Sequence, residues 1–240
     1  MSCAYRKFQP IGAVILLGKE KLKTPTIQVA LDLTSKDRAV SIARALCSVD
    51  SSVIIEAGTP LIKALGVGVI KDLRVAIGED RVLLADMKTI DAGALEAKLA
   101  FESGADITTV LGLADNVTIE SVIGVARKHG RMAQVDLINV RDPLERGVEV
   151  ASIGADIVGL HAGIDAQLGR RLRAVDMIDT LKELHKEVSG RALLSIAGGI
   201  RPEDVRRLVD AGADIIVIGS AITSSNRPVE RLLEAVKNLR

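Results

Sequence analysis

The sequence alternates between short apolar runs and longer amphipathic segments from residue 26 almost to its end. The apolar runs are rich in β-branched side chains, which is typical of strands buried on both faces of a sheet. They lie at residues 26–31, 52–56, 81–85, 107–111, 132–136, 157–160, 192–196 and 215–218. Helical periodicity follows at residues 37–47, 92–101, 118–128, 143–153, 173–188, 203–210 and 229–239. The repeated strand–helix unit predicts a parallel sheet with right-handed crossover connections.

Eight such units favour closure into a single (β/α)8 TIM barrel over an open, doubly wound sheet. The chain has 240 residues, of which 48% are apolar, and single barrels commonly have about 250 residues. No Gly-x-Gly-x-x-Gly motif follows the first apolar run, so a dinucleotide-binding fold loses its main support. We therefore predict an α/β protein with one barrel domain at residues 26–240 and a short N-terminal extension at residues 1–25.

The tetrapeptide Gly-Ala-Asp-Ile occurs three times, at residues 104–107, 154–157 and 212–215. Each copy follows a helical segment and leads into an apolar run. Glycine commonly ends a helix because it can adopt a left-handed backbone conformation. The three copies indicate equivalent strand–helix units within one repeating architecture.

The charge balance gives no support for nucleic-acid binding. The chain carries 32 Lys and Arg against 31 Asp and Glu, for a net charge of +1, whereas nucleic-acid-binding domains are typically basic. Only Tyr5, Phe8 and Phe101 are aromatic, so base stacking is not expected. No run reaches the roughly 18 apolar residues that a membrane-spanning helix needs. We expect neither a nucleic acid nor a membrane as a partner.

Two features bear on where the protein resides. The apolar stretch at residues 11–18 precedes Lys19-Glu20-Lys21 rather than a small-residue cleavage site, so we assign it to the extension and not to a signal peptide. Cys3 and Cys47 lack the spacing of a metal site. We expect reduced thiols and a cytoplasmic location.

Charged residues crowd the end of the third apolar run, in the motif Asp86-x-Lys88-x-x-Asp91. Strand alternation predicts that the side chains of Asp86 and Lys88 lie on the same face. An ordinary ion pair, with Asp91 as a helix N-cap, would explain the motif taken alone. Buried charges are costly unless they pair or hold something, so the ends of the other runs decide between these interpretations.

Other ionisable residues follow the apolar runs in the same way. In a barrel, functional residues lie at the C-terminal ends of the strands. The residues expected there are Asp32, Glu56, Asp86, Lys88, Asp91, Asp115, Asp136, Asn139 and His161. Helix capping accounts for one or two such residues but not for the whole set, so we expect a convergent site.

The chemistry of this set favours a metal-assisted enzyme. Glu56 and Asp86 end adjacent strands, and two carboxylates with sugar oxygens and water suit Mg²⁺. Lys88 could protonate or polarise an oxygen, or stabilise an enediolate. His161 could act as an acid or base near neutral pH. The other histidines, His129 and His185, lie in helical patterns and are expected at the surface.

Glycines follow the last two apolar runs. Gly198-Gly199 and Gly219-Ser220 leave backbone N–H groups accessible beside helix starts, and the loops after strands seven and eight of a barrel often bind phosphate. Arg201, or with less support Arg227, could add positive charge. Tight turns alone would also explain single glycines, but the pair of loops favours a phosphate site.

These residues together resemble the orotidine-monophosphate decarboxylase superfamily. The resemblance rests on the Asp-x-Lys-x-x-Asp motif, on Asp32 after Ala30-Leu31 and on the segment 56–60, Glu-Ala-Gly-Thr-Pro, and it covers nearly all of residues 26–228. Segments 85–93, 109–112, 135–138 and 161–167 are most similar to members that join formaldehyde to a phosphosugar. Residues 1–25 depart from the usual start of the superfamily.

The resemblance implies an enzyme that adds formaldehyde to ribulose 5-phosphate through an enediolate, or that runs this aldol reaction backwards. The implied roles are as follows: Mg²⁺ binding by Glu56 and Asp86, charge stabilisation by Lys88, proton transfer at C1 by His161, contact with substrate hydroxyls or with a metal-bound water by Asp32, substrate binding by Asp136, and phosphate binding by Gly198, Gly199, Gly219 and Ser220. It also implies a homodimer in which Asp91 serves the neighbouring subunit's site.

Three other functions remain as alternatives. The relative that decarboxylates 3-keto-L-gulonate 6-phosphate has an Arg three residues after its His, and Ile164 stands at that position here. A ribulose-phosphate epimerase would want metal-binding histidines on several strands, and only His161 is available. A non-catalytic phosphosugar sensor would have no need of the complete set of ionisable residues.

Overall fold

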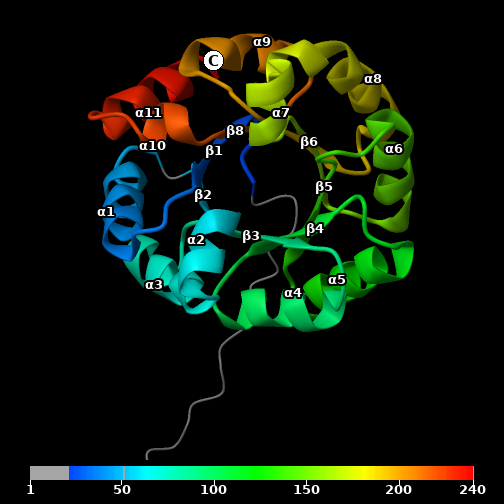
Figure 1. Ribbon diagram of the computed structural model, residues 1–240, viewed down its shortest axis with the longest axis horizontal. Helices are drawn as coiled ribbons and strands as arrows, with labels where there is room; N and C mark the ends of the chain where they lie inside the picture. Colours follow the sequence, from blue (N-terminus) through cyan, green and yellow to red (C-terminus); the bar gives the residue numbers. More distant parts are fainter. Residues whose placement is uncertain (1–21, 51, 240) are drawn as a thin grey trace, which may run out of the picture.

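The computed structural model describes residues 22–50 and 52–239. Its centre is a closed barrel of eight parallel strands in sequence order, in which the last strand pairs with the first (Figure 1). The strands are β1 (Thr26–Leu31), β2 (Ile54–Ala57), β3 (Leu83–Thr89), β4 (Ile107–Leu111), β5 (Met132–Asp136), β6 (Ile157–His161), β7 (Leu193–Ala197) and β8 (Ile215–Ile218). The predicted barrel is confirmed. Residues 1–21 of the predicted extension lie outside the described residues.

Helices surround the barrel as an outer ring (Figure 1). They are α1 (Lys36–Cys47), α2 (Thr59–Leu65), α3 (Gly68–Ile77), α4 (Gly93–Glu102), α5 (Asn116–Lys128), α6 (Pro143–Ile153), α7 (Ile164–Arg170), α8 (Ile178–Val188), α9 (Val205–Asp210), α10 (Ser220–Thr223) and α11 (Pro228–Lys237), with 3₁₀ turns η2 (Ala174–Met177) and η3 (Pro202–Asp204). Helices α2, α3, α7 and α10 were not predicted, and the predicted helix 173–188 begins as η2.

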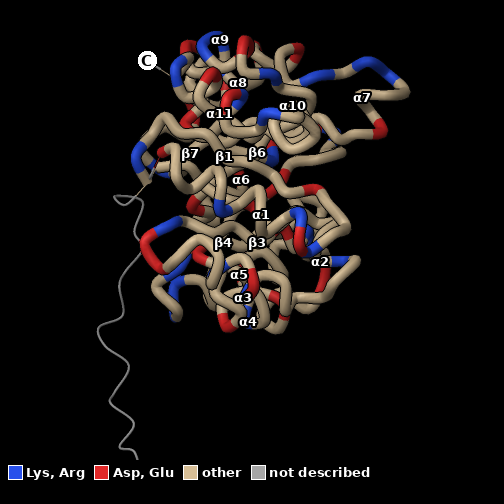
Figure 2. Tube along the Cα trace, turned by 90° about the vertical axis from the view of Figure 1, so that its left-hand side faces the viewer, with Lys and Arg blue, Asp and Glu red and all other residues tan. Residues whose placement is uncertain are grey.

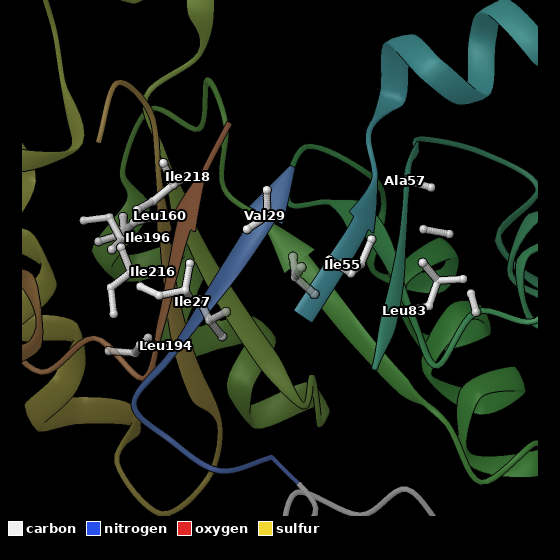
Figure 3. Packing of buried hydrophobic residues seen from close by; sticks show 14 of the residues in the cluster. Ile27, Val29, Ile55, Ala57, Leu83, Leu160, Leu194, Ile196, Ile216 and Ile218 are labelled. Carbon is white, nitrogen blue, oxygen red and sulfur yellow. The ribbon is translucent and has the colours of Figure 1, made fainter. Parts of the chain in front are cut away.

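The core has two layers because side chains of a strand point alternately to opposite faces. Outward-facing residues such as Val29 and Ile216 pack against the helices (Figure 3). Inward-facing apolar residues fill the floor of the barrel, where Leu22 packs beneath them. They include Ile54, Leu84, Ile107, Met132, Ile157 and Ile215.

On β2 to β5 the interior becomes polar two residues further along each strand, at the next inward-facing position. There the residues are Glu56, Asp86, Thr109 and Gln134, whereas Gly159 and Val217 stand at the same level on β6 and β8. An apolar floor beneath a polar upper layer places every ionisable interior group on the C-terminal side of the barrel. The fold therefore concentrates charge at one mouth.

The three Gly-Ala-Asp repeats share one structural device. Asp106, Asp156 and Asp214 each accept a hydrogen bond from a backbone N–H of the preceding strand, at Leu83, Ala133 and Leu194. The N–H of the same aspartate donates back to the carbonyl of that residue in all three copies. The repeat thus fixes the register of neighbouring strands at the bottom of the barrel, and this is a stronger constraint than the helix stop expected from its glycine.

Acidic and basic residues are interspersed along the outer helices, and α7 stands out from the body (Figure 2). No residue of α7 is buried. In the described part of the chain, no helix is long and apolar enough to cross a bilayer.

Candidate active site

Four side chains form a connected network at the C-terminal mouth of the barrel. The Nζ atom of Lys88 lies 2.8 Å from Oδ2 of Asp86 and 2.9 Å from Oδ2 of Asp136. The Nδ1 atom of His161 lies 3.0 Å from the same oxygen of Asp136. Strands β3, β5 and β6 thus bring together residues that are up to 75 positions apart in the sequence, from Asp86 to His161.

Lys88 reaches this network through an irregular strand end. Its φ is +47°, and the pairing of β3 with β4 shifts register between Ala85 and Thr89. The Lys88 N–H donates to Oγ1 of Thr109 at 2.9 Å. The side chains of Asp86 and Lys88 meet as predicted, but a bulge and not regular alternation brings them together. Such bulges re-aim side chains next to functional sites.

Asp86 is buried and held by two threonines that the sequence analysis did not single out. Thr59 donates from Oγ1 to Oδ2 at 2.7 Å, and Thr109 donates from Oγ1 to Oδ1 at 2.8 Å. With Lys88, three donors fix the carboxylate in one orientation. Two polar residues within β4, Thr108 and Thr109, were the one sequence signal for this role.

Lys88 and Asp136 stabilise each other's charged forms. Burial alone would lower the pKa of Lys88, but Asp86 and Asp136 outweigh it and hold this pKa above its ordinary value. Burial alone would raise the pKa of Asp136, but His161 and Lys88 outweigh it and hold the pKa well below its ordinary value. An ammonium and a carboxylate therefore persist at neutral pH, and Asp136 can only accept hydrogen bonds.

A second group of carboxylates lies beside the network. Burial, and then the charges of Asp86 and Asp32, raise the pKa of Glu56 well above its ordinary value. Solvent reaches Asp32 at the mouth, yet desolvation by the surrounding protein and the charge of Asp86 raise its pKa as well. Gln28 donates from Nε2 to Oε2 of Glu56 at 2.7 Å. The neighbouring negative charges, together with burial, thus disfavour the ionised forms of Glu56 and Asp32.

This mutual repulsion is what a divalent cation would relieve. In the part of the chain that the structure describes, no three His, Cys, Asp or Glu side chains form a metal site by themselves. Glu56 and Asp86 fit Mg²⁺ as two protein ligands, because this hard ion takes carboxylate oxygens and completes its shell with water and substrate oxygens. The buried Oε1 of Gln28, which has no hydrogen-bond partner, adds another oxygen close to Glu56.

The carboxylate of Asp32 packs against two glycines. A Cβ atom on Gly58 would lie 2.2 Å from Oδ1 of Asp32, and one on Gly219 would lie 3.5 Å from Oδ2. The carboxylate therefore stands against the ends of both β2 and β8. Glycine at position 58 is what allows Asp32 to reach the carboxylate group.

The predicted phosphate loops lie side by side. Strands β7 and β8 pair directly, so Gly198-Gly199 and Gly219-Ser220 follow neighbouring strand ends. Gly198 and Gly199 have φ values of +118° and +63°, a region that favours glycine. Gly198 also has no room for a side chain, because a Cβ would lie 2.3 Å from the carbonyl oxygen of Ala162.

Other residues predicted for the site lie apart from the network. Asp91 is exposed, and its Oδ1 accepts from the N–H of Ala92, which precedes α4 in a left-handed conformation. Asp115 is the N-cap of α5, so capping explains it. Arg201 is exposed, and Arg227 pairs with Glu230 on the surface. His129 and His185 are exposed as expected, and Asn139 adopts a left-handed conformation in the loop after β5.

Known proteins share both the sequence and the fold. Residues 25–235 match the orotidine 5'-phosphate decarboxylase / HUMPS family. The 3-hexulose-6-phosphate synthases of Methylomonas aminofaciens and Mycobacterium gastri are 42% and 40% identical to the chain. These matches cover 86% and 89% of the chain and 95% and 97% of the relatives.

A crystal structure of a 3-hexulose-6-phosphate synthase superposes with a TM-score of 0.82 and 37% identity, covering 89% of this chain and 99% of that one. The family match spans residues 25–235 and therefore includes every strand that contributes to the network. The chain belongs to the orotidine 5'-phosphate decarboxylase / HUMPS family.

Proposed function

We propose that the protein catalyses the reversible aldol addition of formaldehyde to D-ribulose 5-phosphate, the reaction implied by the name of its 3-hexulose-6-phosphate synthase relatives. The observation that carries this proposal is the connected network of Asp86, Lys88, Asp136 and His161. It holds a permanent positive charge beside a histidine of fixed orientation, and proton removal next to a carbonyl needs both.

The phosphate of the substrate would bind at the two glycine loops. The left-handed turn at Gly198-Gly199 and the start of α10 at Ser220 present backbone N–H groups at neighbouring strand ends. A phosphate held there leaves the rest of the sugar to extend across the mouth. Its carbonyl end then lies over β2, β3 and β6, where Glu56, Lys88 and His161 stand.

The first chemical step would be removal of a proton from C1 by His161. Because Nδ1 of His161 donates to the ionised Asp136, Nε2 carries the free lone pair and acts as the base. The electrons of the C–H bond form the enediolate. Lys88 would stabilise its negative charge, since Asp86 and Asp136 keep the ammonium protonated.

Carbon–carbon bond formation would follow from the same arrangement. C1 of the enediolate attacks the carbon of formaldehyde, and the carbonyl electrons move to its oxygen. That oxygen takes up one proton, which balances the proton lost from C1. In the reverse direction, cleavage of the same bond releases formaldehyde and ribulose 5-phosphate.

Glu56 and Asp86 would hold Mg²⁺, and Asp32 would contact a water of the ion or a substrate hydroxyl. When bound, the ion would supply positive charge that stabilises the negative charge developing on the substrate. The raised pKa values of Glu56 and Asp32 support this assignment, because neither carboxylate is stabilised as an anion by protein cations alone.

A homodimer is the assembly that the surface supports. Exposed apolar side chains gather after β3, on α4 and around the start of α5, at Ile90, Leu95, Leu99, Leu113 and Val117. Helices α4 and α5 lie side by side (Figure 1). Asp91 lies next to Ile90, and its side chain contacts the backbone N–H of Ala92 and not the network of its own subunit. A second copy covering this apolar surface would receive Asp91 into its site.

The thiol of Cys47 supports a reducing, cytoplasmic setting. Within the described residues this cysteine forms no disulfide, and burial raises the pKa of its thiol. A partly buried thiol that stays protonated is compatible with a compartment that keeps cysteines reduced.

One side chain distinguishes this activity from decarboxylation of 3-keto-L-gulonate 6-phosphate. Ile164 begins α7, three residues after His161, and is largely exposed. An apolar side chain there cannot hold the water or proton donor that a decarboxylase needs. In the aldol reaction C1 bonds to the carbon of formaldehyde and not to a proton, so no proton donor is needed at C1.

The direct test is synthesis of hexulose phosphate from ribulose 5-phosphate and formaldehyde. Wild-type protein with Mg²⁺ should form the product, and Lys88→Ala should bind ribulose 5-phosphate but form almost none. Wild-type protein that binds ribulose 5-phosphate without consuming formaldehyde would support a phosphosugar sensor instead. Release of carbon dioxide from 3-keto-L-gulonate 6-phosphate with a higher kcat/KM than that of the aldol reaction would support the decarboxylase function.

A further inference from the structure

The glycine turn after β7 is held from outside by two consecutive residues of the connection between α7 and α8. The Ala174 N–H donates to the carbonyl oxygen of Gly198 at 2.9 Å. The guanidinium of Arg173 donates to the carbonyl oxygen of Gly199 from both Nε, at 3.0 Å, and Nη2, at 2.7 Å. Both carbonyls of the turn are therefore turned towards the same segment.

This arrangement orients the N–H groups of the turn. The C=O and N–H of a trans peptide point in opposite directions within one plane. Fixing the Gly198 carbonyl therefore aims the N–H of Gly199 away from the 173–174 segment, and fixing the Gly199 carbonyl does the same for the N–H of Ile200. Two consecutive donors are thus aligned on the side of the turn that faces away from Arg173.

Arg173 is itself anchored by two carboxylates. Its Nη2 donates to Oδ2 of Asp204 at 2.6 Å, and its own N–H donates to Oδ2 of Asp176 at 2.8 Å. The same oxygen of Asp204 accepts from the N–H of Arg201 at 2.9 Å. The guanidinium therefore links η2 to the turn and to the start of η3, and about one third of its side chain remains exposed.

Side chains also pack closely against Gly199. A Cβ atom on Gly199 would lie 3.3 Å from Cγ of Arg173 and 2.8 Å from Oε1 of Gln167. Gln167, on α7, is fixed by donation from Nε2 to the carbonyl oxygen of Ala162 at 2.8 Å. Side chains from α7 and η2 thus press on the turn from the side opposite its aligned N–H groups.

We propose that Arg173 is a positioning residue for phosphate: it binds no substrate atom but pre-orients the Gly198-Gly199 turn that receives the phosphate of the sugar. This inference rests on the proposed function for the identity of the ligand. A planar guanidinium is required because it donates twice to one carbonyl and once to Asp204, which a lysine ammonium cannot reproduce. Pre-orientation acts on binding of the phosphorylated substrate and not on formaldehyde.

The test measures binding of ribulose 5-phosphate and of inorganic phosphate to the full chain by calorimetry. Arg173→Ala should weaken both about tenfold or more, the scale expected for losing the hydrogen bonds that order a binding loop. The KM for formaldehyde should stay within about twofold, and added guanidinium ion should restore part of the lost affinity. Arg173→Lys keeps the positive charge and is a milder change to the fold. Its affinity for both ligands should lie between those of wild type and Arg173→Ala.

Arg170→Ala is the matched control. Arg170 ends α7 and is exposed, so this variant removes the same charge from the same region. It should bind ribulose 5-phosphate as the wild type does. Equal losses in the Arg170 and Arg173 variants, or wild-type affinity in both Arg173 variants, would overturn the inference. Binding does not require turnover, so an inactive wild type would refute the aldol function without deciding this test.

Discussion

The Nδ1 atom of His161 lies 3.0 Å from Oδ2 of Asp136, the oxygen that Lys88 also contacts at 2.9 Å. Since Asp136 stays ionised and can only accept, this contact assigns the proton of a neutral His161 ring to Nδ1. Nε2 is left as the base. One buried carboxylate therefore sets both the tautomer of the histidine and the charge of the lysine. Substrate binding by Asp136 stays a prediction.

Replacing Asp136 by Asn should separate chemistry from binding. The amide can donate to Nδ1, which favours the wrong tautomer, and it removes a counter-ion of Lys88. We expect kcat to fall about 10²- to 10⁴-fold while the affinity for ribulose 5-phosphate changes little. Steady-state kinetics and calorimetry measure the two effects. His161→Gln should lower kcat by a similar factor. If the two residues act together, the double variant should be little worse than either single variant, and a fall in kcat equal to the product of the two single effects would contradict this.

Gly58→Ala should displace Asp32. The added methyl would lie 2.2 Å from Oδ1 of Asp32 and 3.0 Å from the carbonyl oxygen of Leu31, so the carboxylate or β1 must shift. We expect kcat/KM to fall by about 10-fold or more, since ~1 Å of misplacement is costly at a reacting centre. Gly124→Ala is the control, because this helical position has open space around it. That variant should keep full activity and gain about 0.5–1 kcal/mol of stability.

The pKa of Glu56 predicts how stability changes with pH in the absence of metal. This pKa is raised on folding, so the contribution of Glu56 to stability is fully present below its unfolded pKa and is lost as the pH rises through the higher folded value. Metal-free wild type should therefore lose stability from this group between acidic and neutral pH. Asp136 acts in the opposite sense, because its pKa is lowered, and its contribution is lost only at much lower pH.

Glu56→Gln should remove this loss. The amide can still accept from Gln28 and carries no buried charge, so the melting temperature of the metal-free variant should exceed that of wild type at neutral pH, by about 2–4 °C for each kcal/mol gained. Mg²⁺ should raise the melting temperature of wild type but not of the variant. Equal responses of both proteins to Mg²⁺ would exclude Glu56 as a ligand.

The Gly-Ala-Asp repeat offers a test of the barrel away from the site. Asp214→Ala leaves the N–H of Leu194 without its carboxylate acceptor and should cost about 1–3 kcal/mol in the free energy of unfolding. Asp214→Asn retains an acceptor and should cost much less. Chemical denaturation measures both values, and kcat of the folded variants should match wild type. If the alanine variant were as stable as the asparagine variant, the hydrogen bond from the Leu194 N–H would not stabilise the barrel as proposed.

The strand–helix alternation was sufficient to predict the barrel, because eight repeated units favour closure within a ring of helices and no dinucleotide-binding motif supported an open sheet. It also predicted that Asp86, Lys88, Asp136 and His161 end strands. Their contacts could not be predicted, since the left-handed conformation of Lys88 and its approach to Asp136 depend on a bulge that pairing with β4 creates.

The supporting residues were missed for the same physical reason. Thr59, Thr109 and Gln28 act only through partners on neighbouring strands, so their roles exist only once the sheet has closed. Helix α7 was missed because none of its residues is buried, and an exposed helix has no apolar periodicity to reveal it. Asp115 was predicted to lie near the end of the fourth strand as part of the site but serves as a helix cap, and local sequence cannot separate these two uses of an aspartate.

The most direct measurement is release of formaldehyde from hexulose 6-phosphate, with Mg²⁺ and after chelation, by wild type and by Asp86→Asn. The variant keeps a side-chain acceptor for one of Thr59 and Thr109 and loses the charge that pairs with Lys88 and would bind the ion. We predict release by wild type with Mg²⁺, loss of release after chelation, and little release by the variant under any condition. Release that chelation leaves unchanged, or no release by a wild type that still binds ribulose 5-phosphate, would contradict this prediction.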